Sequence, residues 1–151
     1  MANKTIIISP YSRPLRNGKR NPKNYPYWNK LVKGLKEKGH QVVQIGVKGE
    51  HKIPGVDTVK LNMKLKDLKA LLLECDTWIS VDNFLPHLAE HIKKPGIVIW
   101  GRSNPTNFGY AQNNNILKDV KYLRDEQFKW WEDVEYSEDV FVKPDVILKF
   151  I

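Results

Sequence analysis

The sequence contains a single cysteine, Cys75, and no apolar segment close to the roughly 20 residues that a membrane-spanning helix requires. One cysteine excludes an intrachain disulfide and a cysteine-rich zinc site. The apolar stretch Ile6-Ile7-Ile8 is too short for a signal peptide and predicts a first strand instead. A chain of 151 residues with these absences indicates one cytoplasmic domain, large enough to bury a core, with no membrane span.

Acidic residues are the scarcer charged class, 17 against 25 lysines and arginines, which gives a net charge of +8. Such a balance favours anionic partners, namely nucleotides, nucleic acid or an anionic surface. The positive charge is concentrated in residues 13–23, here named the basic loop, whereas residues 119–145 are more acidic. The basic loop carries Arg13, Arg16, Lys19, Arg20 and Lys23.

Short β-branched runs alternate with helical stripes along the chain, a pattern typical of βαβ units. The expected strands are residues 5–8, 41–45, 58–61, 78–81 and 97–100, and the expected helices are about 26–38, 65–74, 87–92, 122–131 and 144–151. Residues 9–24 and 101–115 are expected to be loops. We therefore predict a single Rossmann-like α/β domain, with a parallel sheet of five or six strands, helices on both faces and residues 119–151 as a C-terminal helical extension.

Polar residues follow three of the expected strands. The basic loop follows the first strand, Lys48-Gly49-Glu50 follows the second, and Asp82 and His87 follow the strand at 78–81. Because the carboxyl ends of parallel strands open on one edge of the sheet, these side chains are expected to converge in one crevice. A helix beginning after Asp82 would add backbone N–H groups suited to an anion.

Each candidate residue also has a simpler interpretation. Glu50 is placed to accept hydrogen bonds from a ribose diol, or it is a solvated surface acid. Ser80 lies inside a strand and is compatible with a buried, satisfied hydroxyl. His87 and His91 share a helical face, yet no H-E-x-x-H glutamate and no third ligand accompany them, so we expect no metal site.

The aromatic residues beside the basic loop and near the C-terminus have two interpretations each. Tyr25, Tyr27 and Trp28 are placed to stack on bases of a nucleic acid, or to pack a helix onto the sheet. Trp130 and Trp131, if they lie on a helix, point to different sides of it and suggest either core packing or an interface with a second copy or partner.

Several motifs then appear in a fixed order along the chain. They are Lys23-Asn24-Tyr25-Pro26, Gly46-Val47-Lys48-Gly49-Glu50, Asp82-Asn83-Phe84-Leu85-Pro86-His87-Leu88-Ala89, Lys93-Lys94-Pro95-Gly96-Ile97-Val98, Trp100-Gly101-Arg102-Ser103-Asn104-Pro105 and Val142-Lys143-Pro144-Asp145-Val146-Ile147. As a set, they resemble the C-terminal, nucleotide-sugar-binding half of glycosyltransferase family 9, the ADP-heptose:lipopolysaccharide heptosyltransferases of the GT-B fold. The family's corresponding motifs are K-x-W-P, G-G-x-x-E, D-[ST]-G-x-x-H-L-A, G-K-P-x-[IV] and F-G-x-[TS]-x-P.

The resemblance implies a role for each matching residue. Lys23, with Arg20 nearby, would meet the diphosphate, and Glu50 would hold the ribose. Asp82 would contact the sugar or hold its loop, and His87 would support that loop or the phosphate; both are candidate catalytic residues if an acceptor reaches this edge. The backbone at Asn83, Phe84 and Leu85 would cradle the phosphates, and Gly46 and Ser80 complete the expected binding set. No metal or other cofactor is required, because cationic side chains can neutralise the diphosphate.

The sequence also departs from the family pattern. Phe84 replaces a glycine and is expected to reshape the pocket, while Asn83 replaces a serine or threonine. The chain matches only one half of a GT-B enzyme, so the acceptor side would come from a partner chain, a second copy or the acidic C-terminal segment. The sequence thus favours a glycosyltransferase-like protein that binds a nucleotide-diphosphate sugar, with an ADP-sugar preferred. The alternatives are a non-catalytic nucleotide-binding module and nucleic-acid binding through the basic loop.

Overall fold

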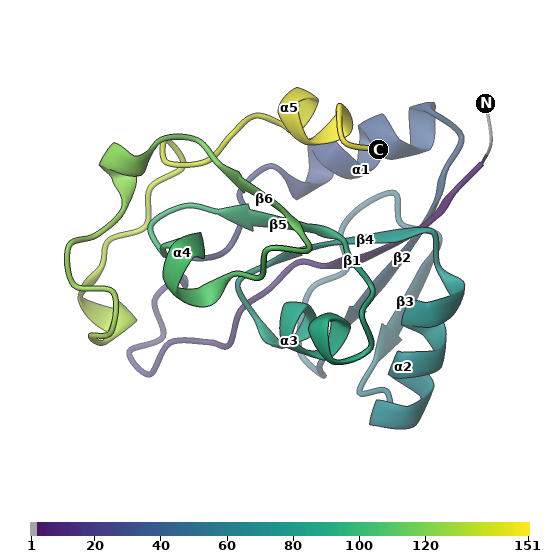
Figure 1. Cartoon of the computed structure of the whole chain (residues 1–151), viewed down its shortest axis with the longest axis horizontal. Helices are drawn as coiled ribbons and strands as arrows, with labels where there is room; N and C mark the ends of the chain where they lie inside the picture. Colours follow the sequence, from purple (N-terminus) through teal and green to yellow (C-terminus); the bar gives the residue numbers. More distant parts are fainter. Residues whose placement is uncertain (1–2) are drawn as a thin grey trace.

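The protein is built on one parallel sheet of six strands in the order β3-β2-β1-β4-β5-β6, seen in a computed structural model that describes residues 3–151 (Figure 1). The strands are β1 (Thr5–Ser9), β2 (Gln41–Gly46), β3 (Thr58–Leu61), β4 (Thr77–Val81), β5 (Ile97–Trp100) and β6 (Asn114–Leu117). Every neighbouring pair is parallel, from Val43 opposite Thr58 at one edge to Ile99 opposite Ile116 at the other. The predicted α/β, Rossmann-like fold is confirmed.

Alternating residues along the strands pack into two hydrophobic cores, one on each face of the sheet. Ile6 and Ile8 of β1 point to the face covered by α1 (Trp28–Glu37) and α5 (Pro144–Leu148), whereas Ile7 points to the face covered by α2 (Leu65–Glu74) and α3 (Phe84–His91). Figure 1 shows the two helix pairs on either side of the sheet. Because both faces are buried, the strands read as continuous apolar runs, as is typical of parallel sheets.

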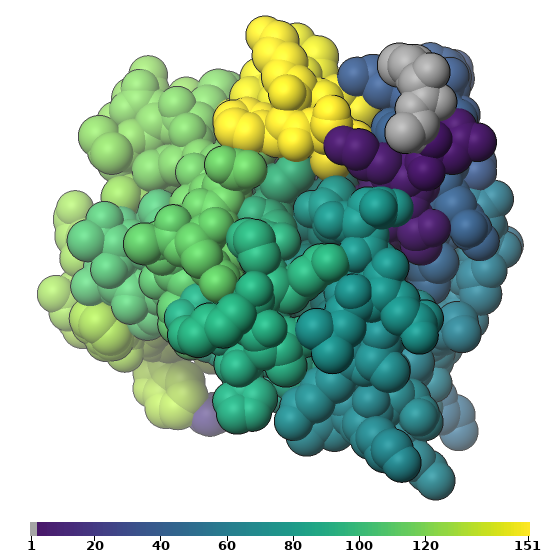
Figure 2. Space-filling model, turned by 45° about the vertical axis from the view of Figure 1, so that its right-hand side comes forward, coloured from purple at the N-terminus to yellow at the C-terminus, as the bar shows by residue number. Residues whose placement is uncertain are grey.

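The C-terminal segment is part of the core. Val140, Phe141 and Val142 are buried beneath α1, and Tyr25 donates its hydroxyl to the Val142 carbonyl at 2.9 Å. Helix α5 packs so closely on α1 that a Cβ added at Gly34 would lie 2.7 Å from Leu148 Cδ1. Figure 2 shows the last residues, in yellow, at the top of the view.

The order of the strands creates a switch point at the centre of the sheet. From β1 the chain runs outward through β2 and β3, and α2 then returns it to β4 on the other side of β1. The helices that follow β1 and β4 therefore lie on opposite faces and leave a crevice between the carboxyl ends of these strands. Ligands of open α/β sheets bind at such a point.

Two segments differ from the sequence expectation. The stretch expected to be a loop at 101–115 contains α4 (Pro105–Phe108), and β6 begins at its end. The helix expected at 122–131 is wrong: the structure has only the single turns η1 (Val120–Tyr122) and η2 (Trp131–Asp133). Here the Arg124 guanidinium binds the carbonyls of Gln127, Lys129 and Trp130, so these residues form a loop closed around a side chain and not a helix with i to i+4 hydrogen bonds. Within residues 3–151, no helix combines the length and apolarity needed to cross a membrane.

Removal of the Phe141 ring tests whether the C-terminal segment is integral to the fold. Phe141 is fully buried, so Phe141→Ala is expected to lower the free energy of unfolding by about 3–5 kcal/mol, measured by urea denaturation. Phe128→Ala is the matched control, because that ring is 79% exposed. Similar small losses in both variants would show that residues 140–142 add little to the core.

Candidate functional site

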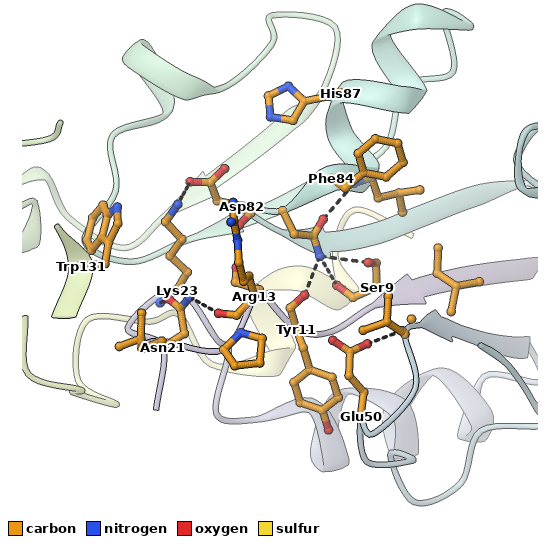
Figure 3. Close-up of a pocket in the computed structure, with 18 of the residues that line it drawn as sticks. Ser9, Tyr11, Arg13, Asn21, Lys23, Glu50, Asp82, Phe84, His87 and Trp131 are labelled. Atoms are coloured by element: carbon orange, nitrogen blue, oxygen red, sulfur yellow. Dashed lines mark hydrogen bonds and ion pairs between the residues drawn. The ribbon is translucent and has the colours of Figure 1, made fainter. Parts of the chain in front are cut away.

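A cavity of about 1000 Å³ opens at the carboxyl edge of the sheet, at the switch point between β1 and β4 (Figure 3). Its walls come from five parts of the chain: the loop after β1, the turn after β2, the β3–α2 connection, the start of α3, and residues 129–132. The three polar strand ends that the sequence singled out therefore do converge, and the C-terminal segment adds a wall that the sequence did not indicate.

Asn83 holds the crevice together. Its Nδ2 donates to Ser9 Oγ at 2.9 Å and to the carbonyl of Tyr11 at 3.1 Å, which ties the end of β1 to the end of β4. Its Oδ1 accepts from the backbone N–H of Leu85 at 3.0 Å, capping α3, and from Ser80 Oγ at 2.9 Å. One side chain thereby fixes two strands and a helix start in relation to one another.

Lys23 and Asp82 form a largely buried ion pair in the middle of the cavity. Lys23 Nζ lies 2.9 Å from Asp82 Oδ2, with the two side chains 21% and 10% exposed. Oδ2 has no other donor among the described residues, and the Coulomb attraction of the nearby ammonium offsets its burial. Ser12 Oγ donates to the Asp82 carbonyl at 2.6 Å and Asn21 Oδ1 accepts from the Lys23 N–H, so both loops are fixed around the pair.

Glu50 occupies another part of the cavity, at the turn after β2. Its Oε1 accepts from the N–H of Val47 at 2.9 Å. A Cβ on Gly46 would lie against that same oxygen, so the missing side chain at this position leaves room for the Glu50 carboxylate. Burial raises the pKa of Glu50, and the hydrogen bond from Val47 opposes that shift. Met63, Leu65 and Leu68 line the cavity close to this turn and give it an apolar surface.

Two of the expected site residues do not reach the cavity. Arg20 points away, with its guanidinium 3.9 Å from the centre of the Tyr136 ring. Ser80 is fully buried, and its hydroxyl donates to Asn83 Oδ1. This agrees with the simpler interpretation of Ser80 as a buried, satisfied hydroxyl. The other expected residues line the cavity: Lys23, Gly46, Glu50, Asp82, Asn83, Phe84, Leu85 and His87.

The start of α3 offers an anion few backbone donors. The Leu85 N–H is already bonded to Asn83, and Pro86 has no N–H. The expected backbone cradle over residues 83–85 is thus reduced, and the positive charge at the cavity comes from side chains. Arg13 and Arg16 line the cavity together with Lys23 and supply that charge.

The histidines occupy different surroundings. His87, on the first turn of α3, is exposed at the cavity, and its Nδ1 lies 2.6 Å from the Tyr110 hydroxyl. His91 is exposed and does not line the cavity. Within residues 3–151, no three His, Cys, Asp or Glu side chains are grouped as metal ligands.

The wall that sequence reasoning missed consists of residues 129–132. Arg16 stacks on Trp130 at 3.9 Å from the ring centre, and its N–H donates to Glu132 Oε2 at 3.1 Å. Arg124 stacks on Trp131 at 3.7 Å. In the sequence, only the adjacent Trp130 and Trp131 pointed to a role for this segment. No local pattern predicts that they lie at the edge of the sheet, because the segment is not the expected helix. Of the aromatic residues beside the basic loop, Tyr25 and Trp28 are buried in the core and are not free to stack on bases.

Comparison with known proteins agrees with this geometry. The sequence profile of glycosyltransferase family 9 (heptosyltransferase) matches residues 2–129. No curated protein sequence matches the chain. Among solved structures, E. coli ADP-heptose LPS heptosyltransferase II superposes with a TM-score of 0.67 at 17% identity, over 97% of this chain and 45% of that one.

Two further heptosyltransferases give similar agreement. E. coli WaaC with ADP has a TM-score of 0.65 at 16% identity, over 99% of this chain and 43% of that one. The dodecameric heptosyltransferase TibC of E. coli, in complex with ADP-D-β-D-heptose, has a TM-score of 0.66 at 15% identity, over 95% of this chain and 36% of that one. The chain thus spans less than half the length of these proteins. Because the family profile covers most of the sequence, the chain belongs to glycosyltransferase family 9.

Proposed function

We propose that this protein is the donor-binding part of a glycosyltransferase and binds a nucleotide-diphosphate sugar, with an ADP-sugar preferred. One observation carries the proposal: a single cavity at the switch point joins an acidic residue, Glu50, to a group of positive side chains around Lys23. A nucleotide-diphosphate sugar needs this combination, an acceptor for its ribose and cations for its diphosphate. ADP is preferred because the similar structures hold ADP or ADP-heptose.

The nucleoside fits the side of the cavity beside β2. Glu50 uses Oε1 to hold its own turn, which leaves Oε2 for the hydroxyls of a ribose. Met63, Leu65 and Leu68 offer apolar contact to a base next to it. Hydroxyl-to-carboxylate bonds are charge-assisted and fix orientation more strongly than neutral ones.

The diphosphate then lies beside β1 and β4, facing Arg13, Arg16 and Lys23. These cations would stabilise the negative charge that develops on the leaving diphosphate during transfer, the kind of fixed electrostatic contribution that dominates many transfer reactions. A base that activates the acceptor is left unassigned, and Asp82 or His87 would serve only if the acceptor reached this edge.

Calorimetric titration with ADP, UDP, GDP and their sugar conjugates tests the proposal. We expect saturable binding of one nucleotide, weakened about tenfold or more in Glu50→Gln, which removes the charge but keeps the acceptor for Val47. Glu37→Gln is the matched control, since Glu37 is exposed on α1. The proposal fails if no nucleotide binds, or if the two variants bind equally. Binding without turnover on any added acceptor would instead support a non-catalytic binding module.

Nucleic-acid binding is the competing use of the positive charge. The dependence of affinity on salt concentration distinguishes it from nucleotide binding. A nucleic-acid site would lose affinity by several orders of magnitude between about 50 and 200 mM salt and would be indifferent to Glu50→Gln. The buried positions of Tyr25 and Trp28 weigh against that use. We expect oligonucleotides not to compete with the bound nucleotide at about 150 mM salt in a fluorescence displacement assay.

The raised pKa of Glu50 makes a separate prediction about stability. The folded protein holds this proton more tightly than the unfolded chain, so the stability that Glu50 contributes is present below its ordinary pKa of 4.5 and is lost as the pH rises through the raised pKa. Glu50→Gln does not titrate. The difference in Tm between Glu50→Gln and the wild type should therefore grow in favour of the variant from about pH 4 to about pH 7. A difference that is constant or falls with pH would contradict the burial of this carboxyl.

A further inference from the structure

His87 has a hydrogen-bond partner that lies outside the cavity. The His87 side chain lines the cavity from the first turn of α3, and Figure 3 shows its ring above Asp82 in the view. Its Nδ1 lies 2.6 Å from the Tyr110 hydroxyl, and the two rings meet edge to face with their centres 5.4 Å apart. Tyr110 does not line the cavity itself. Tyr110 can therefore affect a ligand in the cavity only through His87.

The backbone of Tyr110 is fixed by the neighbouring strands. Asn115 of β6 donates from Nδ2 to the Tyr110 carbonyl at 2.9 Å, and its Oδ1 accepts from Trp100 Nε1 at 3.0 Å. Trp100 is buried at the end of β5. A Cβ added at Gly109 would lie 2.7 Å from the carbonyl oxygen of Pro105, so the chain before Tyr110 packs tightly against α4. Because the segment is already ordered in this way, little conformational entropy is lost when a ligand uses His87.

The chemistry of the two groups decides which of them donates the proton. A phenol hydroxyl is a good donor and a weak acceptor, whereas the unprotonated nitrogen of a neutral imidazole is a good acceptor. The Tyr110 hydroxyl therefore donates to His87 Nδ1. The hydrogen bond at one ring nitrogen sets the protonation of the other, so the single proton of the neutral ring lies on Nε2. His87 then offers the cavity a donor, in addition to the positive charges of Lys23, Arg13 and Arg16.

We propose that Tyr110 is a positioning residue of the nucleotide site: its hydroxyl holds His87 in the tautomer that carries the proton on Nε2, and this N–H donates to the diphosphate. The inference rests on the proposed function and assigns one role to His87. With the proton on Nε2, His87 presents a hydrogen-bond donor and no basic nitrogen to the cavity. The inference also gives Asn115 a role, because its side chain links Tyr110 to the two strands β5 and β6.

Nitrogen-15 NMR of the histidine side chains tests the tautomer without a ligand. At about pH 8.5, where a histidine is ordinarily neutral, we expect His87 of the wild type to show a protonated Nε2 and an unprotonated Nδ1. Tyr110→Phe removes the hydroxyl and keeps the ring, so the two nitrogen shifts should move toward the average of the two tautomers. His91, exposed on the same helix, is the internal control and should not change. A proton on Nδ1 in the wild type, or identical His87 shifts in the two proteins, would overturn the proposal.

Calorimetry with ADP and adenosine tests the contact with the diphosphate. We expect His87→Ala to lower the affinity for ADP about tenfold and Tyr110→Phe about threefold, with the affinity for adenosine unchanged in both. His87→Gln keeps an N–H donor and should recover part of the loss, and His91→Ala is the matched control on the same helix.

The outcomes separate this inference from the proposed function. If the wild type binds ADP and either His87→Ala or Tyr110→Phe binds it equally well, the positioning role is wrong and the nucleotide site stands. An equal loss of affinity for ADP and adenosine in Tyr110→Phe would also overturn the inference, because it would indicate a general change of the cavity. If the wild type binds no ADP, the proposed function fails, and the role of His87 toward a diphosphate fails with it.

Discussion

The crevice depends above all on the hydrogen bonds of Asn83. The parallel ladder pairs β1 with β4 as far as Ser9 opposite Ser80, but the helices that follow the two strands diverge to opposite faces, so the ladder does not join the loops beyond that point. Asn83 joins these loops with one amide, donating to Ser9 and Tyr11 and capping α3. Where the family pattern has serine or threonine, the amide adds a two-hydrogen donor that a hydroxyl lacks. The cavity can therefore stay open without the two loops drifting apart.

This arrangement leaves few free backbone N–H groups at the start of α3. In many α/β proteins the helix start supplies several free N–H groups to a phosphate. Here Asn83 occupies the Leu85 N–H, and Pro86 removes another donor. Phe84 begins the helix with its ring 60% exposed at the cavity, where the family pattern has a glycine that allows close approach. The positive charge at the cavity comes instead from Lys23, Arg13 and Arg16, three of the five cationic residues of the basic loop.

The C-terminal residues complete the site from the opposite side. Contacts between arginines and aromatic rings join them to the basic loop: Arg16 lies on Trp130 and Arg124 on Trp131. These contacts combine stacking with charge and tolerate partial exposure to solvent, as planar guanidinium groups do. The sheet edge thus has an apolar side near α2 and an aromatic side near η2, with the ion pair of Lys23 and Asp82 between them.

The fold class, five of the six strands and the convergence of Glu50, Lys23 and Asp82 can be predicted from the sequence, because strand runs and their polar ends are local patterns and a parallel sheet brings those ends to one edge. Strand β6 cannot, because Asn114 and Asn115 resemble loop residues, and the sequence indicates a helix where Arg124 instead binds carbonyls of its own loop. The contact of Arg20 with Tyr136 and the position of Trp131 at the cavity depend on tertiary packing. The direction of a side chain in an irregular segment is set by partners distant in sequence, and no local periodicity predicts them.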